Sequence, residues 1–384
     1  MKGVGIIGTD GHIPHVGFMD TAEAMRRVGN NTGNLVFQYA VYNLIGESKY
    51  LIGQDIPWDI GTIREVCRVI VIPSANFIRE NFDLTAMVEF LEKVDLPLIF
   101  FGLGAQARDY NQTKFNFHPS IDKLIALIRE RSKLVSVRGQ FTAKMLNQMG
   151  VSQTVVTGCP SNHINPSANL PQIIAKKLEN PMRSFITHGD EPWPKDHAKQ
   201  EVERKLVAWT RQGASMMSQQ SVPAFMEYLR NNNPAAITEI PEKREASLHS
   251  ALMPGTSIDE FRDFIASKLR VYFSVHQWIE DSSKYDFSVG LRLHGNMVAW
   301  QAGTPALWVY HDSRTQELAE TMELPRIPFK IFINECATVQ DAWDRVEFDP
   351  VIYGKRRALL KNRIVQVMET EDIKVANSAE TNPA

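Results

Sequence analysis

Residues 284–310 constrain the fold most strongly, because they predict a strand, a short helix and a second strand in direct succession. The apolar run from Tyr285 to Leu293 predicts a buried strand that gives way to a turn at Gly295. Residues 296–302 then predict a short helix, and the apolar run from Ala306 to Tyr310 predicts the next strand. A strand, helix and strand connected in this order form a parallel crossover unit.

Two polar side chains, Arg292 and His294, stand at the carboxyl end of the first of these strands. Open parallel sheets bind ligands beyond that end. Residues two apart in an extended chain project to the same side, and the N–H groups of a helix that begins at Gly295 follow at once, which suits an anion. Each residue alone is more simply explained as a capping group, a core group or a partner for a surface acid. Their combination favours a functional site.

The first half of the chain alternates apolar runs of strand length with helical segments. Strands are predicted at 68–73, 98–104, 134–137 and 154–157, and helices at 84–94, 121–132 and 140–149. This alternation indicates a doubly wound α/β sheet that is covered on both faces. A chain of 384 residues is expected to form two domains. Their predicted extents are 1–175 and 176–345, with a link near 170–183, a closing helix at 346–370 and a disordered polar tail at 371–384.

Further candidate binding residues lie in turns beside these elements. The loop 29–34 leads into a predicted helix, so Asn30, Gly33 and Asn34 could present polar groups to a phosphate or a sugar, although an ordinary turn with an asparagine cap explains the loop more simply. Gly104 and Gln106 follow the second strand, where glycine would let a ligand approach the backbone, and structural and functional explanations are equally good there. Arg138 ends the strand at 134–137, directly before a helix.

Composition narrows the classes of function. A net charge of -2 gives no general attraction to nucleic acid. The three cysteines are far apart and lack metal-ligand spacing, which predicts a reducing compartment and no metal site. The amino terminus does not resemble a signal peptide, and no apolar stretch approaches the ~20 residues that span a bilayer. We therefore expect a cytoplasmic protein.

Three segments together resemble the polysaccharide pyruvyl transferase family: SVRGQFTAKMLNQMGV at 136–151, VVTGCPSN at 155–162, and GLRLHGNMVAWQAGTPAL at 290–307. The Arg-Leu-His-Gly element with Gly-x-Pro downstream is the most specific part. The resemblance extends from about residue 29 to residue 324 and implies two Rossmann-like doubly wound domains facing a cleft, similar to the GT-B arrangement. The sequence departs from the family's pattern at two places: Leu35 stands where many members have an acidic residue, and Gly158-Cys159-Pro160 replaces a more usual Asp-Pro. These departures affect the expected acceptor sugar more than the expected donor.

The resemblance also implies an activity. Members of the family transfer pyruvate from phosphoenolpyruvate to a sugar during synthesis of exopolysaccharides and similar glycans, and form a ketal on two hydroxyls. By position, Arg292 and His294 correspond to the family's donor-binding and catalytic pair, Arg138 to its first-domain arginine, and Asn30, Gly33 and Asn34 to its early glycine loop. No cofactor or metal is implied beyond phosphoenolpyruvate as donor substrate. The expected partner is a sugar or lipid-linked glycan. Peripheral contact with a membrane-bound precursor and the oligomeric state stay open.

The residue chemistry agrees with this donor. Two guanidinium forks suit a carboxylate and a phosphate, and His294 would protonate the methylene carbon if its pKa lies near neutrality. Two alternatives stay open. One is a GT-B-type glycosyltransferase that uses a nucleotide-sugar, and the other is a catalytically silent binding subunit.

Overall fold

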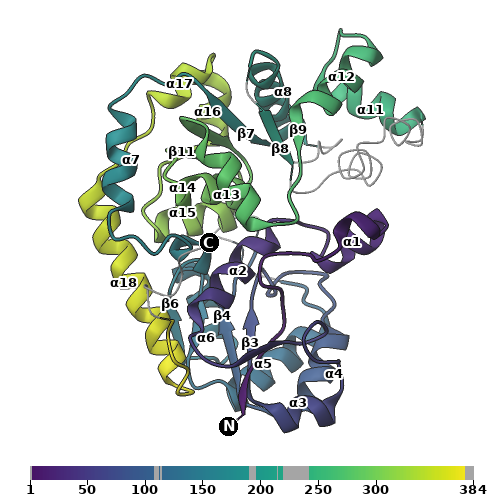
Figure 1. The fold of residues 1–384 in the computed structure, drawn as a ribbon, viewed down its shortest axis with the longest axis vertical. Helices are drawn as coiled ribbons and strands as arrows, with labels where there is room; N and C mark the ends of the chain where they lie inside the picture. The colour runs from purple at the N-terminus through teal and green to yellow at the C-terminus, as the bar shows by residue number, and fades with distance from the viewer. Residues whose placement is uncertain are drawn as a thin grey trace.

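Two parallel sheets, one in each half of the chain, organise the computed structural model, as Figure 1 shows. The structure describes residues 2–107, 112, 115–189, 196–213, 215–218 and 242–376. Within the segment 208–257, for which the sequence suggests helices broken by loops, residues 214 and 219–241 lie outside the described residues. The predicted α/β class with two Rossmann-like domains is confirmed by the sheet topology described below.

The first sheet has the parallel strand order β2-β1-β3-β4, and the parallel pair β5-β6 adjoins β4 through a bridge between Leu103 and Val137. Its central strand β3 is buried over almost its whole length, which is why it consists of apolar residues. The strands are β1 (Gly3–Ile6), β2 (Lys49–Leu51), β3 (Cys67–Pro73), β4 (Leu98–Phe101), β5 (Val135–Val137) and β6 (Thr154–Val156).

Helices cover both faces of the first sheet. Ile70 and Ile72 of β3 pack in one core cluster with residues of α3, α4 and α5, whereas Val69 and Val71 pack in another with residues of α2 and α18. The alternation of side chains along β3 therefore feeds two cores. The helices of this half are α1 (Thr21–Arg27), α2 (Asn34–Leu44), α3 (Ile60–Val66), α4 (Thr85–Val94), α5 (Pro119–Arg131) and α6 (Gln140–Gln148), with 3₁₀ turns η1 (Val16–Phe18) and η2 (Pro160–His163).

The second sheet has the parallel order β12-β11-β10-β7-β8-β9. The chain runs outward from β7 in one direction and from β10 in the other, so the order reverses between these two strands. This is the Rossmann order, and its switch point is the usual place for a ligand. The strands are β7 (Phe185–Gly189), β8 (Ser215–Ser218), β9 (Leu269–Arg270), β10 (Phe287–Gly290), β11 (Ala306–Tyr310) and β12 (Arg326–Pro328).

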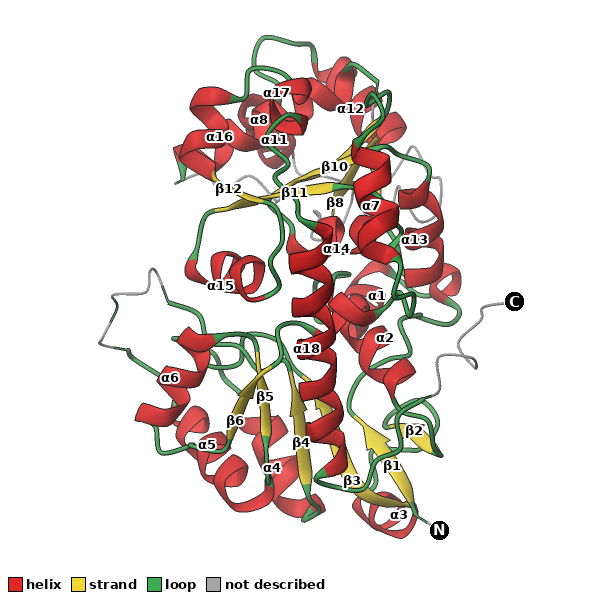
Figure 2. Cartoon of the chain, turned by 90° about the vertical axis from the view of Figure 1, so that its left-hand side faces the viewer, coloured by secondary structure: helices red, strands yellow, loops and turns green. Residues whose placement is uncertain are grey.

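Helices α8 and α16 cover one face of this sheet, while α14 and α15 cover the other and turn toward the first domain (Figure 2). The helices are α7 (Leu170–Leu178), α8 (His197–Arg211), α11 (Glu242–Leu252), α12 (Ile258–Lys268), α13 (Val275–Ser283), α14 (Leu293–Gln301), α15 (Ser313–Thr321), α16 (Phe329–Glu335) and α17 (Val339–Trp343). Among the described helices, none is long and apolar enough to cross a bilayer.

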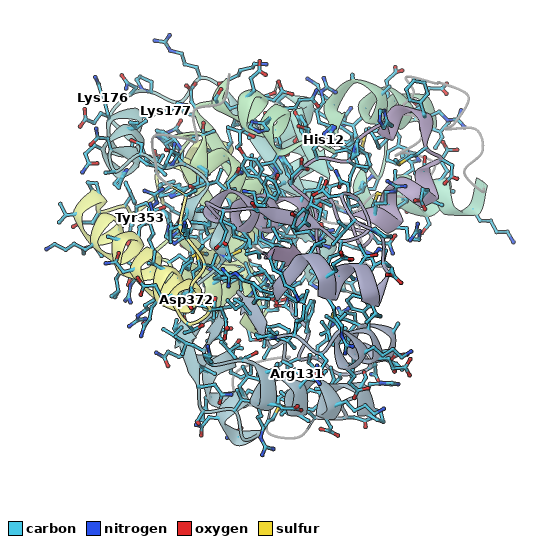
Figure 3. All side chains as sticks on the ribbon, turned by 60° about the horizontal axis from the view of Figure 1, so that its bottom comes forward. His12, Arg131, Lys176, Lys177, Tyr353 and Asp372 are labelled. Carbon is cyan, nitrogen blue, oxygen red and sulfur yellow. The ribbon has the colours of Figure 1, made fainter. Side chains whose placement is uncertain are left out.

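Helix α18 (Pro350–Glu369) joins the two domains. The helix begins beside α7 and ends against the first sheet. Figure 3 labels Tyr353 near its first end and Asp372 just beyond its last residue. Tyr353 is buried in the second domain's core, whereas Ile364 and Val367 belong to the core of the first. The chain therefore returns to its first domain after completing the second.

Three segments differ from the sequence predictions. The link expected at 170–183 contains α7, because Leu170 and Ile174 share a buried helical face. The expected tail is packed as far as residue 376, since Ile373 is buried and Val375 pairs with Ile45; the rest of it lies outside the described residues. The strand expected at 285–293 ends earlier, and α14 begins at Leu293.

Candidate active site

A cavity of about 80 Å³ lies between the carboxyl ends of the two sheets. Its lining combines residues that follow β3, β5, β10 and β11 with residues of α2 and of the loop that leads into it. The lining residues are Asn31, Asn34, Phe37, Ala75, Asn76, Arg138, Leu291, Arg292, Leu293, His294, His311, Arg314, Thr315 and Leu318. The structure thus brings Arg138 to the same cavity as Arg292 and His294, from which it lies far apart in the sequence.

Arg138 is buried in the first domain's wall of this cavity. Its Nε, Nη1 and Nη2 atoms donate hydrogen bonds to Gly102 O at 2.9 Å, Asn76 Oδ1 at 2.8 Å and Ser74 O at 3.3 Å. These acceptors stand at the ends of β3 and β4, so the sheet itself orients the guanidinium. Three of the five N–H groups are used in this way, which leaves two for a ligand.

Gly104 makes room for this arrangement. A Cβ atom there would lie 2.5 Å from Asn76 Oδ1 and 2.7 Å from Arg138 Cδ, closer than side-chain carbons approach such atoms. The sequence predicts Gly104 as a ligand-binding position. The structure places Gly104 outside the cavity lining and against the side chain of Arg138. It can therefore affect a ligand only by positioning that arginine.

Arg292 is the N-cap residue of α14, and His294 lies in the helix's first turn rather than on an extended chain. The predicted reason for their common orientation is therefore wrong, although both side chains line the cavity. Arg292 is buried, and its Nε donates to Gly189 O at 3.4 Å, at the end of the neighbouring strand β7. The pair consequently stands at the switch point of the second sheet.

His294 is buried among cations. Its ring centroid lies 5.5 Å from that of Phe37, and Nε2 lies 3.6 Å from Cys159 Sγ. Burial, and after it the positive charges of Arg138, Arg314 and Arg292, lowers the pKa of His294 from 6.5 to about 3. The imidazole is therefore neutral at pH 7 when no anion is bound, and an anion that offsets the arginines would raise its pKa.

Arg314 is a third cavity arginine that the sequence analysis did not select. It lies in the first turn of α15, just beyond β11, and its Nη2 is 3.3 Å from Asp312 Oδ2. Although burial acts to raise it, the charges of Arg314 and His311 lower the pKa of Asp312 to about 2. The signal for Arg314 was present in the sequence, because it follows a strand as Arg292 and Arg138 do.

The other predicted residues occupy different places. Asn34 lines the cavity as the first residue of α2, and its Nδ2 donates to Val28 O at 2.9 Å. Gly33 is the N-cap of the same helix, but Asn30 is exposed in a left-handed turn outside the cavity lining. Gln106 also lies outside the lining, with its Oε1 atom buried and unpaired.

Gly295 lies outside the cavity lining as well. It packs against the ring of His188, and a Cβ atom there would collide with that imidazole. His188 is wholly buried at the end of β7, and neither of its ring nitrogens has a hydrogen-bond partner within the described parts of the chain. Gly295 thus allows the first turn of α14 to close over the end of β7. Among the described residues, no group of three or more His, Cys, Asp or Glu side chains is arranged to hold a metal ion.

The cavity thus lies between the carboxyl edges of two Rossmann-like sheets, which is where such sheets usually bind ligands, and three arginines line it. The sequence model of the family described as polysaccharide pyruvyl transferase matches residues 30–313. The chain belongs to this family and is therefore a transferase.

Comparison with solved structures finds similar chains of low identity. A putative UDP-N-acetylglucosamine 2-epimerase from Listeria monocytogenes is 12% identical, with a TM-score of 0.48 and 96% of both chains covered. The UDP-GlcNAc 2-epimerase of Methanocaldococcus jannaschii, in complex with UDP-GlcNAc and UDP, is 12% identical with a TM-score of 0.48 and covers 96% of this chain and 100% of its own. A variant of the wall teichoic acid polymerase TagF is 9% identical with a TM-score of 0.42, and the match covers 97% of this chain and 90% of that one. No curated protein matches the sequence.

Proposed function

We propose that the protein transfers the pyruvyl group of phosphoenolpyruvate to two hydroxyls of a sugar, in a polysaccharide or its precursor, with Arg138, Arg292 and Arg314 binding the donor. The observation that carries this proposal is the lining of the cavity. It holds three arginines from two domains and, among its described residues, no carboxylate. Phosphoenolpyruvate has a phosphate and a carboxylate, and guanidinium groups bind both in a bidentate manner.

The size of the cavity supports a small donor. Its volume of about 80 Å³ is well below the roughly 300–1,000 Å³ of pockets that enclose drug-sized ligands. A three-carbon phosphorylated acid suits such a volume better than a nucleotide-sugar does. The amino terminus of α14 adds a favourable dipole and free N–H groups on the same side.

The proposed reaction begins with proton transfer to the methylene carbon of phosphoenolpyruvate, which forms a C–H bond and leaves a cationic C2 carbon. A sugar hydroxyl attacks C2 and loses its proton. The proton released by this first hydroxyl restores the one that His294 gave up. A second hydroxyl of the same sugar then displaces phosphate, which leaves with that hydroxyl's proton, and closes the ketal. In this scheme the arginines hold the two anionic groups, and His294, protonated when the donor binds, supplies the first proton.

The test is to incubate the protein with phosphoenolpyruvate and a panel of lipid-linked and activated sugars, and to measure phosphate release and the mass of the product. We expect phosphate and a sugar heavier by one pyruvyl ketal. His294→Ala should lower turnover by roughly 10²- to 10⁴-fold. His249→Ala, on α11 and outside the cavity lining, is the matched control and should keep wild-type activity.

The same panel includes nucleotide-sugars. Release of a nucleoside diphosphate with phosphoenolpyruvate unconsumed would overturn the proposal in favour of a glycosyltransferase. Wild-type turnover by His294→Ala would remove the proposed acid.

A further inference from the structure

Glu317 of α15 reaches from the second domain to the first turn of a helix in the first domain. Its Oε1 atom accepts a hydrogen bond from Thr142 N at 2.8 Å, and its Oε2 atom accepts one from Thr142 Oγ1 at 3.0 Å. The carboxylate is 4% exposed, so both bonds are shielded from water. Thr142 is the third residue of α6. The contact is therefore a helix cap supplied by the other domain.

Helix α6 needs such a cap, because its own N-cap residue is Gly139 and offers no side chain to the first-turn N–H groups. The same glycine makes the contact sterically feasible, since a Cβ atom at Gly139 would collide with the side chain of Glu317. A carboxylate at a helix amino terminus also interacts favourably with the helix dipole. Sequence and geometry at this junction thus agree on a cap from outside the domain.

The two elements that Glu317 joins both carry cavity arginines. Arg138 directly precedes Gly139 and α6, and Arg314 lies one turn before Glu317 on α15. A second bond also ties α15 to the first domain, because Ser313 Oγ donates to Ala107 O, in the segment that follows β4, at 3.0 Å. The hydrogen bonds of Glu317 and Ser313 therefore fix the distance between Arg138 of the first domain and Arg314 of the second.

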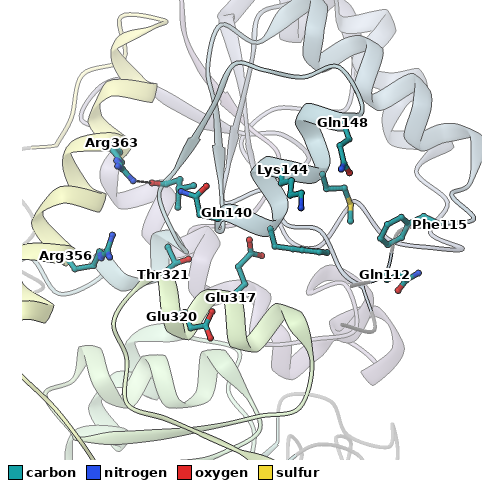
Figure 4. A pocket seen from close by; sticks show the side chains of 13 residues that line it. Gln112, Phe115, Gln140, Lys144, Gln148, Glu317, Glu320, Thr321, Arg356 and Arg363 are labelled. Atoms are coloured by element: carbon teal, nitrogen blue, oxygen red, sulfur yellow. Dashed lines mark hydrogen bonds between the residues drawn. The ribbon is translucent and has the colours of Figure 1, made fainter. Parts of the chain in front are cut away.

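We propose that Glu317 is a positioning residue that holds Arg138 and Arg314 at the spacing needed to grip one anion, by capping α6 across the domain interface. It acts through Thr142 and does not line the donor cavity. It lies instead on the wall of a separate hollow of about 630 Å³, where Figure 4 shows it rising from α15 toward Gln140 and Lys144 of α6. The readout with phosphoenolpyruvate rests on the proposed function, whereas the capping role does not.

The test compares Glu317→Ala and Glu317→Gln with Glu320→Gln. Glu320 lies one turn further along α15 in the same hollow, and its Oε1 accepts a bond from Gln316 at 2.8 Å. Hydrogen exchange of the peptide that contains Thr142 is measured first, without any ligand. We expect faster exchange in Glu317→Ala, a smaller change in Glu317→Gln, which keeps one acceptor, and wild-type exchange in Glu320→Gln. The Glu317→Ala, Thr142→Ala double variant should exchange no faster than Glu317→Ala alone.

Donor affinity is measured next by calorimetry with phosphoenolpyruvate. Loss of a helix cap changes an equilibrium constant about tenfold. We therefore expect Glu317→Ala to bind phosphoenolpyruvate about tenfold more weakly than the wild type. In turnover, its KM should change more than its kcat. Wild-type exchange and affinity in a folded Glu317→Ala would overturn the inference, as would equal effects in Glu320→Gln. If the wild-type protein protects Thr142 through Glu317 but does not bind phosphoenolpyruvate, the proposed donor fails and the cap stands. Glu317→Gln supplies the same comparison if the alanine variant does not fold.

Discussion

The Nε2 atom of His294 lies 3.6 Å from the sulfur of Cys159, so the candidate acid faces a thiol. The thiol is wholly buried and accepts a hydrogen bond from Ser161 Oγ at 3.0 Å. A thiol is a weak partner that can orient an imidazole but does little to stabilise its charged form. The structure therefore keeps His294 oriented and neutral until another group supplies negative charge.

Replacing this thiol should have a small effect compared with replacing the imidazole. In Cys159→Ala, His294 loses an orienting contact but keeps its place against Phe37 and among the arginines. We expect kcat to fall by less than about tenfold, against roughly 10²- to 10⁴-fold for His294→Ala. Phosphate release under saturating donor measures both. A loss in Cys159→Ala as large as in His294→Ala would instead place the sulfur in the chemistry.

Donor binding should bring a proton to His294. Without a bound anion its pKa is lowered to about 3, first by burial and then by three arginine charges, so it is unprotonated at pH 7. A bound phosphate and carboxylate offset those charges and attract a cation, which raises the pKa in the complex. Calorimetry with phosphoenolpyruvate in two buffers of different ionisation enthalpy should show proton uptake by the wild type. The His294→Gln variant, which corrects for protonation of the donor itself, should take up about one proton fewer. Equal uptake by both proteins would contradict the prediction.

The buried imidazole of His188 should make the fold sensitive to acid. Burial lowers its pKa from 6.5 to about 3. Between these values the unfolded chain binds a proton that the folded protein does not, so the free energy of unfolding falls as the pH drops below 6.5. At pH 5 the loss relative to pH 7 is about 2 kcal/mol for one such histidine.

Urea unfolding at pH 7 and pH 5 measures this loss. His188→Asn removes the titrating group, so its stability should fall by about 2 kcal/mol less than that of the wild type between the two pH values. The comparison holds even if the substitution lowers stability at both. An unchanged pH dependence would show that another group governs the acid response.

Much of this architecture follows from local patterns in the sequence. Apolar runs such as Cys67–Pro73 predict covered parallel strands, and the rule that ligands bind at carboxyl ends directs attention to Arg138 and Arg292, which the structure places on one cavity. The same rule would also have selected Arg314, had it been applied to the strand before it. These signals are local, because they need only the residues of one strand and the turn that follows.

What the sequence does not reveal depends on contacts between distant segments. Nothing near Gly139 indicates that its missing side chain is replaced by Glu317, which lies in the other domain. The lowered pKa of His294 likewise results from burial and arginines that only the fold brings together. The packing of residues 371–376 is also missed by the sequence, because the partner of Val375 is the distant Ile45.

Gly104 offers a test of the orientation of Arg138. Alanine at this position would press on Asn76 Oδ1 and Arg138 Cδ, at 2.5 and 2.7 Å, and so displace the guanidinium. Such overpacking typically costs about 1–3 kcal/mol. We expect a folded protein that binds phosphoenolpyruvate about tenfold more weakly or worse by calorimetry. Gly17→Ala, where a Cβ atom would meet nothing within 4 Å, is the control and should bind like the wild type. Equal binding by the Gly104 variant would show that the arginine is not held against this glycine.

Helix α18 should hold the two domains together through Arg357, and its neighbour Arg356 provides the control. The Arg357 guanidinium donates to the carbonyls of Asn162 at 3.0 Å and Ser167 at 2.9 Å, and also to that of Asn165. These carbonyls lie around the passage from the first domain to the second, and Arg357→Met would leave them without charged donors.

Hydrogen bonds from charged groups contribute about 1.5–3 kcal/mol each. Burial of the Arg357 guanidinium, which lowers its pKa, offsets part of the sum, so we expect Arg357→Met to lower the free energy of unfolding by about 2–4 kcal/mol. Arg356 pairs with Glu323 at 3.1 Å with both side chains more than a third exposed, at 38% and 35%. Arg356→Met should therefore change stability by less than about 1 kcal/mol. Urea denaturation of the two variants measures the difference. If the free energy of unfolding of Arg357→Met falls by as little as that of Arg356→Met, α18 is held by its apolar face alone. Tyr353, Ile364 and Val367 of that face are unchanged in both variants.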